Sequence, residues 1–91
     1  MKTEVIFRKS RDGEVIAIFP YILWDHNGNV TSYMHIGQHG ACGIFFTWVF
    51  PKLATPEEYK PLLDELTQVG YDLKIVKRVN MARYRKQLHN D

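Results

Sequence analysis

The sequence predicts an α+β fold, with a small, mostly antiparallel sheet of four or five strands and one amphipathic helix packed on one face. Three observations predict this fold. Residues 55–70 carry the start signal, the apolar spacing and the stop signal of a helix. Apolar and polar residues alternate before and after this segment, which is typical of strands. Turn-forming residues at 10–13 and 24–29 separate the first three strands.

The first two strands are expected at residues 3–9 (TEVIFRK) and 14–23 (EVIAIFPYIL). Gly13 suits the positive φ of a tight turn, so we expect the two strands to pair as a hairpin. The second strand is apolar on both of its faces, which predicts that both faces are covered. Pro20 cannot donate a ladder hydrogen bond, so we expect a bulge or an edge beyond Phe19.

The third strand is expected at residues 30–36 (VTSYMHI), after an Asn27–Gly28 turn. Three glycines in residues 37–43 (GQHGACG) predict a tight bend that lies free at the rim of the sheet. Residues 44–50 (IFFTWVF) are rich in aromatic and β-branched residues, which favours a fourth strand. A short buried helix is the alternative, because periodicity does not separate the two in so short a run.

The predicted helix begins after Thr55, whose hydroxyl can cap it while Glu58 reaches back to complete a capping box. Gly70 is suited to end it. Pro61 lies inside the helix, where it removes one hydrogen bond, so we expect a kink or a loosened first turn. The apolar positions recur every three or four residues and form one stripe: Tyr59, Leu62, Leu63, Leu66 and Val69.

Alternation after Gly70 predicts the last strand, at residues 71–76. The expected element order is therefore β-β-β-(β)-α-β. We expect residues 1–79 to form a single domain and residues 80–91 to form a basic C-terminal tail or a short helix capped by Asn80.

The cysteine content and the apolar runs indicate a cytoplasmic protein. Cys42 is the one cysteine, so no internal disulfide can form, which fits a reducing compartment. The longest apolar runs, at residues 15–24 and 44–50, are too short to cross a bilayer, and the first residues do not read as a secretory signal. We expect no membrane partner and no cofactor.

The charge is uneven along the chain. Residues 72–91 hold six basic and two acidic residues, whereas residues 1–71 hold six basic and eight acidic ones. Such a basic segment could bind nucleic acid, although a solvated tail or a protected edge strand has the same composition. The candidate nucleic-acid patch comprises Lys74, Lys77, Arg78, Arg83, Arg85 and Lys86.

The glycine-rich segment supplies the candidate chemistry of a small enzyme or metal site: His35, Gln38, His39 and Cys42. Two imidazoles and a thiol could bind zinc, but a fourth ligand would have to come from a distant part of the chain. Cys42 could instead act as a nucleophile with His35 or His39 as its base. GQHGACG lacks the lysine of a phosphate-binding loop. The alternative is ordinary structural roles for these side chains.

Aromatic residues favour a protein-binding role. A chain with two Trp, five Tyr and five Phe is too small to bury all of them, and exposed aromatic side chains are typical of interfaces. The candidate interface residues are Trp24, Phe46, Trp48 and Phe50. We therefore predict a non-enzymatic binding or accessory protein that uses a protein–protein interface, with an unknown partner or a second copy. Nucleic-acid binding and a small enzyme are the alternatives.

Several segments between residue 4 and residue 78 carry a family resemblance: EVIFR at 4–8, DGEVIAIFP at 12–20, SYMHIGQHGA at 32–41, ATPEEY at 54–59 and GYDLKIVKR at 70–78. They resemble a family of short, uncharacterised proteins encoded on bacterial mobile elements and phages, which has no assigned activity. The resemblance implies a compact domain in a bacterial cytoplasm and adds no catalytic residues. Pro61 and the aromatic run at 44–50 depart from the family pattern, and the chain beyond Val79 lies outside it.

Overall fold

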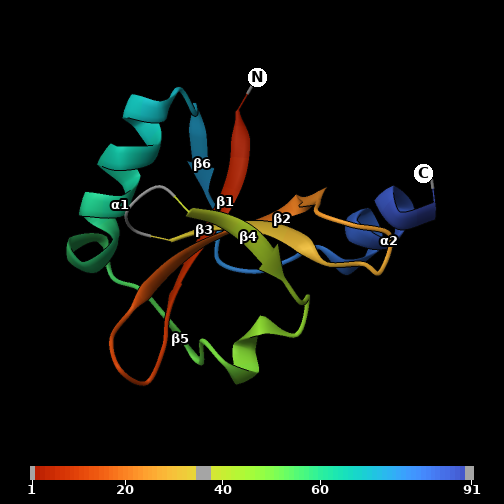
Figure 1. Ribbon diagram of the computed structural model, residues 1–91, viewed down its shortest axis with the longest axis horizontal. Helices are drawn as coiled ribbons and strands as arrows, with labels where there is room; N and C mark the ends of the chain where they lie inside the picture. Colours follow the sequence, from red (N-terminus) through yellow and green to blue (C-terminus); the bar gives the residue numbers. More distant parts are fainter. Residues whose placement is uncertain (1, 35–37, 90–91) are drawn as a thin grey trace.

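A computed structural model describes residues 2–34 and 38–89, apart from the side chain of Gln38, and confirms the predicted α+β class. Six strands form a sheet in the order β4-β3-β2-β1-β5, and β6 also pairs with β1. Figure 1 shows α1 on one side of this sheet and α2 on the other. The strands are β1 (Thr3–Lys9), β2 (Val15–Leu23), β3 (Val30–Met34), β4 (Gln38–Cys42), β5 (Lys52–Leu53) and β6 (Leu73–Ile75), and the helices are the 3₁₀ helix η1 (Phe46–Trp48), α1 (Pro56–Val69) and α2 (Met81–His89).

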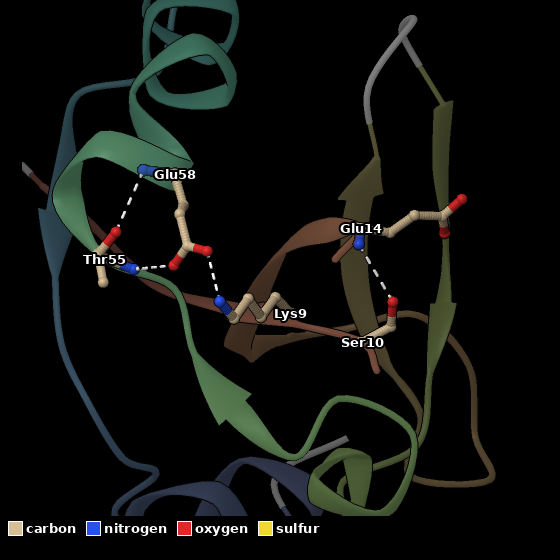
Figure 2. A network of polar contacts seen from close by, with 5 residues as sticks. All are labelled: Lys9, Ser10, Glu14, Thr55 and Glu58. Carbon is tan, nitrogen blue, oxygen red and sulfur yellow. Dashed lines mark hydrogen bonds and ion pairs between the residues drawn. The ribbon is translucent and has the colours of Figure 1, made fainter. Parts of the chain in front are cut away.

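The β1–β2 hairpin forms as the turn residues predict, and it lies in the interior of the sheet. Ile6 pairs with Ile18, and Arg8 pairs with Ile16. In the connecting loop, the Gly13 N–H donates to the Ser10 carbonyl at 3.0 Å and Gly13 has a φ of 90°. The Glu14 N–H donates to the Ser10 hydroxyl at 3.1 Å, and Figure 2 shows this contact.

Both faces of the β1–β2 hairpin are buried, because successive side chains of a strand point to opposite faces. On one face, a cluster that we call the α1-side core joins Val5, Phe7, Ala17, Phe19 and Tyr33 to Leu62 and Leu66 of the helix. On the other face, the α2-side core comprises Ile6, Ile16, Ile18, Val30, Cys42, Phe46 and Tyr84. The register between β2 and β3 shifts between Phe19 and Leu23, so the irregularity predicted at Pro20 is confirmed.

The glycine-rich segment contains a strand rather than a bend, so that prediction is wrong for residues 38–42. β4 pairs with β3 in register from Met34↔Gln38 to Val30↔Cys42, and the Ser32 hydroxyl donates to the Gly40 carbonyl at 3.0 Å. Within the described residues, positive φ occurs at Gly13, Gly28 and Gly70, so Gly40 is not a turn residue. Residues 35–37, where the end of the third strand and the start of the bend were expected, lie outside the described residues.

Residues 44–50 do not form the expected fourth strand. Phe46–Trp48 is a 3₁₀ turn, and the N–H groups of Val49 and Phe50 both donate to the Phe46 carbonyl. The physical reason is topological. β4 is at one edge of the sheet and β5 pairs with β1 on the opposite side, so the connecting chain must cross a face of the sheet and cannot pair within it.

Helix α1 forms as its sequence predicts. The capping box is complete, since the Glu58 N–H donates to the Thr55 hydroxyl and the Thr55 N–H donates to the Glu58 carboxylate. Figure 2 shows both contacts. The Tyr59 N–H donates to the Thr55 carbonyl at 3.0 Å, so Pro61 does not loosen the first turn, and the helix runs unbroken to Val69.

The C-terminal segment forms a helix that docks on the sheet. The Arg83 N–H donates to the Asn80 side chain at 3.1 Å, so the predicted cap is present. Tyr84 is buried, and its hydroxyl donates to the Gly28 carbonyl at 2.5 Å. Gly28 has a φ of 85°, and a Cβ there would lie 2.8 Å from that hydroxyl, so the turn has no room for a larger residue.

Candidate functional site

The most exposed large apolar side chains of the described residues lie on the segment that crosses the sheet face. Phe45 is 75% exposed, Trp48 is 80% exposed and Val49 is 64% exposed. We call these three residues the aromatic surface. In Figure 1 the segment that carries them lies at the lower end of the molecule, beside β5.

The fold requires this segment to cross the sheet but buries few of its side chains. Phe46 is only 6% exposed and packs in the α2-side core, with Ile44 and Phe50 partly buried against the same core. Phe45 precedes the 3₁₀ turn as its N-cap and Trp48 is its last residue, and both are exposed while Phe46 between them is buried. The buried Phe46 therefore anchors a turn that presents its neighbours to solvent.

The aromatic surface is large for a chain of this size. A fully exposed aromatic side chain offers about 150–250 Å², so the three residues together expose roughly 400 Å² of mainly apolar area. The largest apolar patches on monomeric proteins are of this order and are often functional.

Arg8 fixes the end of this segment. Its Nε donates to the Phe50 carbonyl at 2.7 Å, and its Nη2 donates to the Pro51 carbonyl at 2.8 Å. The guanidinium carbon also lies 5.9 Å from the centroid of the Phe46 ring. Partial burial lowers the pKa of the Arg8 guanidinium, which nevertheless stays charged at neutral pH.

The four predicted interface aromatics differ in exposure. Trp48 is exposed, and Trp24 is 48% exposed but belongs to the β2–β3 loop. Phe46 is a core residue, so its assignment to an exposed surface is corrected, and Phe50 is half-buried. An alternating strand would have placed Phe46, Trp48 and Phe50 on one face, whereas the 3₁₀ turn exposes Phe45 and Val49 instead.

The candidate catalytic or metal-binding residues are not gathered in one place. His39 and Cys42 lie on opposite faces of β4. His39 Nε2 is 2.9 Å from the Tyr71 hydroxyl, and its ring packs edge-on against Tyr33. Cys42 belongs to the α2-side core, where burial raises the pKa of its thiol and disfavours the reactive thiolate.

The other members of that candidate site give no further support. His35 lies outside the described residues, and the side chain of Gln38 is not described. Among the residues that the structure does describe, no group of three or more His, Cys, Asp or Glu side chains is placed to hold a metal ion. His39 and Cys42 therefore do not form a nucleophile–base pair.

The candidate nucleic-acid residues are all exposed and are spread over three parts of the chain. Lys74 lies on β6, Lys77 and Arg78 lie between β6 and α2, and three residues lie on α2. Arg83 of α2 is engaged within the protein, because it forms an ion pair with Glu4 and its guanidinium carbon lies 3.9 Å from the centroid of the Tyr21 ring.

A separate hollow of about 310 Å³ lies at the sheet edge, between β5, β6 and the start of α1. Its wall is mainly apolar, and Lys77 is its one charged residue. The hollow contains no cluster of acidic, histidine or cysteine side chains that would indicate catalysis. Its lining residues are Phe7, Leu53, Ala54, Thr55, Pro56, Tyr59, Ile75, Val76 and Lys77.

Comparison with known proteins does not assign the chain to a family. No protein-family model, no curated protein and no solved structure matches it. In the part of the chain that the structure describes, no helix is both long enough and apolar enough to span a membrane.

Proposed function

We propose that this protein is a non-enzymatic binding or accessory protein that recognises another protein through the aromatic surface. The observation that carries the proposal is the exposure of Phe45, Trp48 and Val49 on a turn whose neighbour Phe46 is buried. Aromatic residues are enriched in protein interfaces and in their energetic centres. None of the three belongs to either core, so packing of the domain does not account for their presence.

The size of the surface indicates a reversible contact. Covering roughly 400 Å² on each partner buries less than the 1,200–2,000 Å² of a standard interface. Interfaces below this range are typical of weak or transient contacts, which suits an accessory protein that binds and releases its partner.

The expected setting of this partner comes from the family resemblance alone. A chain that resembles the short proteins of bacterial mobile elements and phages would meet its partner in a bacterial cytoplasm. Within this proposal, the partner is a protein of the host cell or of the same mobile element.

Site-specific photocrosslinking in the native host tests the proposed function. A benzophenone amino acid replaces Phe45, and a matched control carries it at Gln68, which is exposed on α1. We expect a discrete protein adduct from position 45, none from position 68, and loss of the adduct when Trp48→Ser is added. Equal adducts from both positions, or none from position 45, would contradict the proposal.

Nucleic-acid binding by the basic C-terminal segment is the second candidate. Five of its six cations, Lys74, Lys77, Arg78, Arg85 and Lys86, are exposed and form no ion pair within the described residues. Binding through them should weaken steeply with added salt and fall when Arg85 and Lys86 are changed to Gln. Absence of binding to DNA and RNA at low salt would end this candidate.

A further inference from the structure

The end of the molecule that carries the aromatic surface also carries cations without counter-ions. Arg8, Arg11 and Lys52 form no ion pair with a carboxylate within the described residues. Their neighbour Lys9 differs, because it is paired with Glu58, and Figure 2 shows this contact. Within the described residues, a carboxylate therefore pairs with Lys9 but with none of the other three cations.

Arg8 contacts the segment that carries the aromatic surface. A guanidinium has five N–H donors in a planar fork, and the Phe50 and Pro51 carbonyls occupy one on Nε and one on Nη2. The remaining donors can still bind a carboxylate. Its partial burial disfavours the charge, and that cost would be relieved by an anionic group brought by a partner.

Arg11 and Lys52 line a hollow of about 250 Å³, together with Lys9, Ser10, Gly13 and Pro51. Pro51 connects this hollow to Arg8, because its carbonyl accepts from the Arg8 guanidinium. The nearby acidic residues Asp12 and Glu14 are not part of its wall. Lys52 follows Trp48 by four residues, so their Cα atoms are at most about 14 Å apart. An extended segment of a few residues can therefore reach from the aromatic surface to the hollow.

Building on the proposed function, we infer that the partner is an acidic protein segment. Its apolar residue covers Trp48 and Phe45, and its Asp or Glu side chains bind at Arg8 and at the hollow lined by Arg11 and Lys52. Charge complementarity supports this occupant, because complementary potentials favour association and reject unsuitable partners.

The same charges disfavour two other occupants. A twofold contact between two copies of this chain would bring the three cations of one copy toward those of the other. A nucleic-acid strand presents a continuous row of phosphates, whereas the cations here are few and are interrupted by the exposed carboxylates of Asp12 and Glu14. Separate carboxylates beside an apolar residue fit this end of the molecule better than either.

Peptide selection on the full chain tests the inference. Short random peptides displayed on phage are selected at low salt, and peptides that bind equally well to the Trp48→Ser protein are removed. We expect the remaining peptides to combine an aromatic or aliphatic residue with a nearby Asp or Glu. The affinity of a selected peptide should fall about tenfold for the double variant Arg11→Gln/Lys52→Gln, since charge-assisted hydrogen bonds are lost.

The matched control is Arg85→Gln/Lys86→Gln, which removes the same charge from α2 and should leave peptide affinity unchanged. If the Trp48-dependent peptides are not enriched in Asp or Glu, the inference of an acidic partner is wrong, while the proposed function stands. Trp48-dependent binding to a single-stranded oligothymidine would show instead that the surface binds nucleic acid. A Trp48-dependent dimer on sizing would show that it binds a second copy of the chain. Either result would overturn the inference of an acidic protein segment. Failure to select any Trp48-dependent peptide would count against both the inference and the proposed function.

Discussion

The two faces of the sheet are covered in different ways. One face is covered by α1, a capped helix whose apolar stripe lies on the α1-side core and whose Tyr59 ring stacks on Phe7 at 4.5 Å. The other face is covered by two shorter pieces, the η1 segment and α2. Helix α1 packs most of its apolar stripe against the sheet, whereas the η1 segment leaves the aromatic surface in solvent.

Buried apolar residues of α1 stabilise the fold, whereas the exposed ones of the η1 segment are available for binding. Leu62 and Leu66 stabilise the fold because packing removes them from water. Phe45 and Trp48 remain exposed to water in the isolated chain, and the proposed function assigns them to a contact with a partner. Variants on the two faces should therefore separate stability from binding.

The largest effect on stability is expected on the α1 face. Leu66 is fully buried, so Leu66→Ala should lower the free energy of unfolding by about 2–5 kcal/mol, through lost transfer energy and the cavity left behind. Urea denaturation measures this change. Val69→Ala is the matched control on the same helix, because Val69 is 57% exposed and its truncation should stay within about 0.5 kcal/mol. Equal losses for the two variants would contradict the assigned packing of α1.

A smaller effect is expected for Tyr84→Phe on the α2 face. The change removes the hydroxyl that donates to the buried Gly28 carbonyl and leaves that carbonyl unsatisfied, which should cost about 1–3 kcal/mol. Tyr71→Phe is the control, since its hydroxyl contacts the exposed His39 and its loss should cost less. A Tyr84→Phe protein as stable as the wild type would mean that α2 is not docked as described.

The pair Lys9–Glu58 predicts how stability depends on pH. The Lys9 ammonium, followed by the Thr55 N–H, lowers the pKa of Glu58 from 4.5 to about 2. A lowered pKa in the folded state means that the contribution to stability is present above pH 4.5 and is lost as the pH falls through about 2. Figure 2 shows the contacts that are responsible.

Denaturation of Glu58→Gln across this pH range measures that contribution. We expect the loss of stability between pH 4.5 and 2 to be smaller in the variant than in the wild type, because Gln keeps the cap but does not titrate. Lys9→Met should weaken the same dependence by removing the partner. Parallel curves for wild type and Glu58→Gln would refute the assignment.

Local chemistry explains why much of the fold could be predicted. The capping box at Thr55 and Glu58, the turn at Gly13 and the alternation of β1 are all set by residues that are close in sequence. The two buried faces of β2 were also predictable, since its apolar residues are consecutive and each face needs a cover.

The predictions for β4 and for the η1 segment were wrong because these two segments depend on contacts between residues that are distant in sequence. β4 forms because β3 offers it a partner edge, which its glycines do not reveal. The η1 segment turns because β4 and β5 lie on opposite sides of the sheet, and the local preference of its aromatic residues for a strand is overridden. Trp48 was therefore identified from its residue type, but Phe45 and Arg8 needed the path of the chain across the sheet.

The most direct test of the central claim is the free energy of unfolding of the triple variant Phe45→Ser/Trp48→Ser/Val49→Ser. If these side chains serve binding and not folding, the triple variant should unfold within about 1 kcal/mol of the wild type. A loss of about 3 kcal/mol or more, comparable to that of Leu66→Ala, would show that the aromatic surface belongs to the core and would contradict this account.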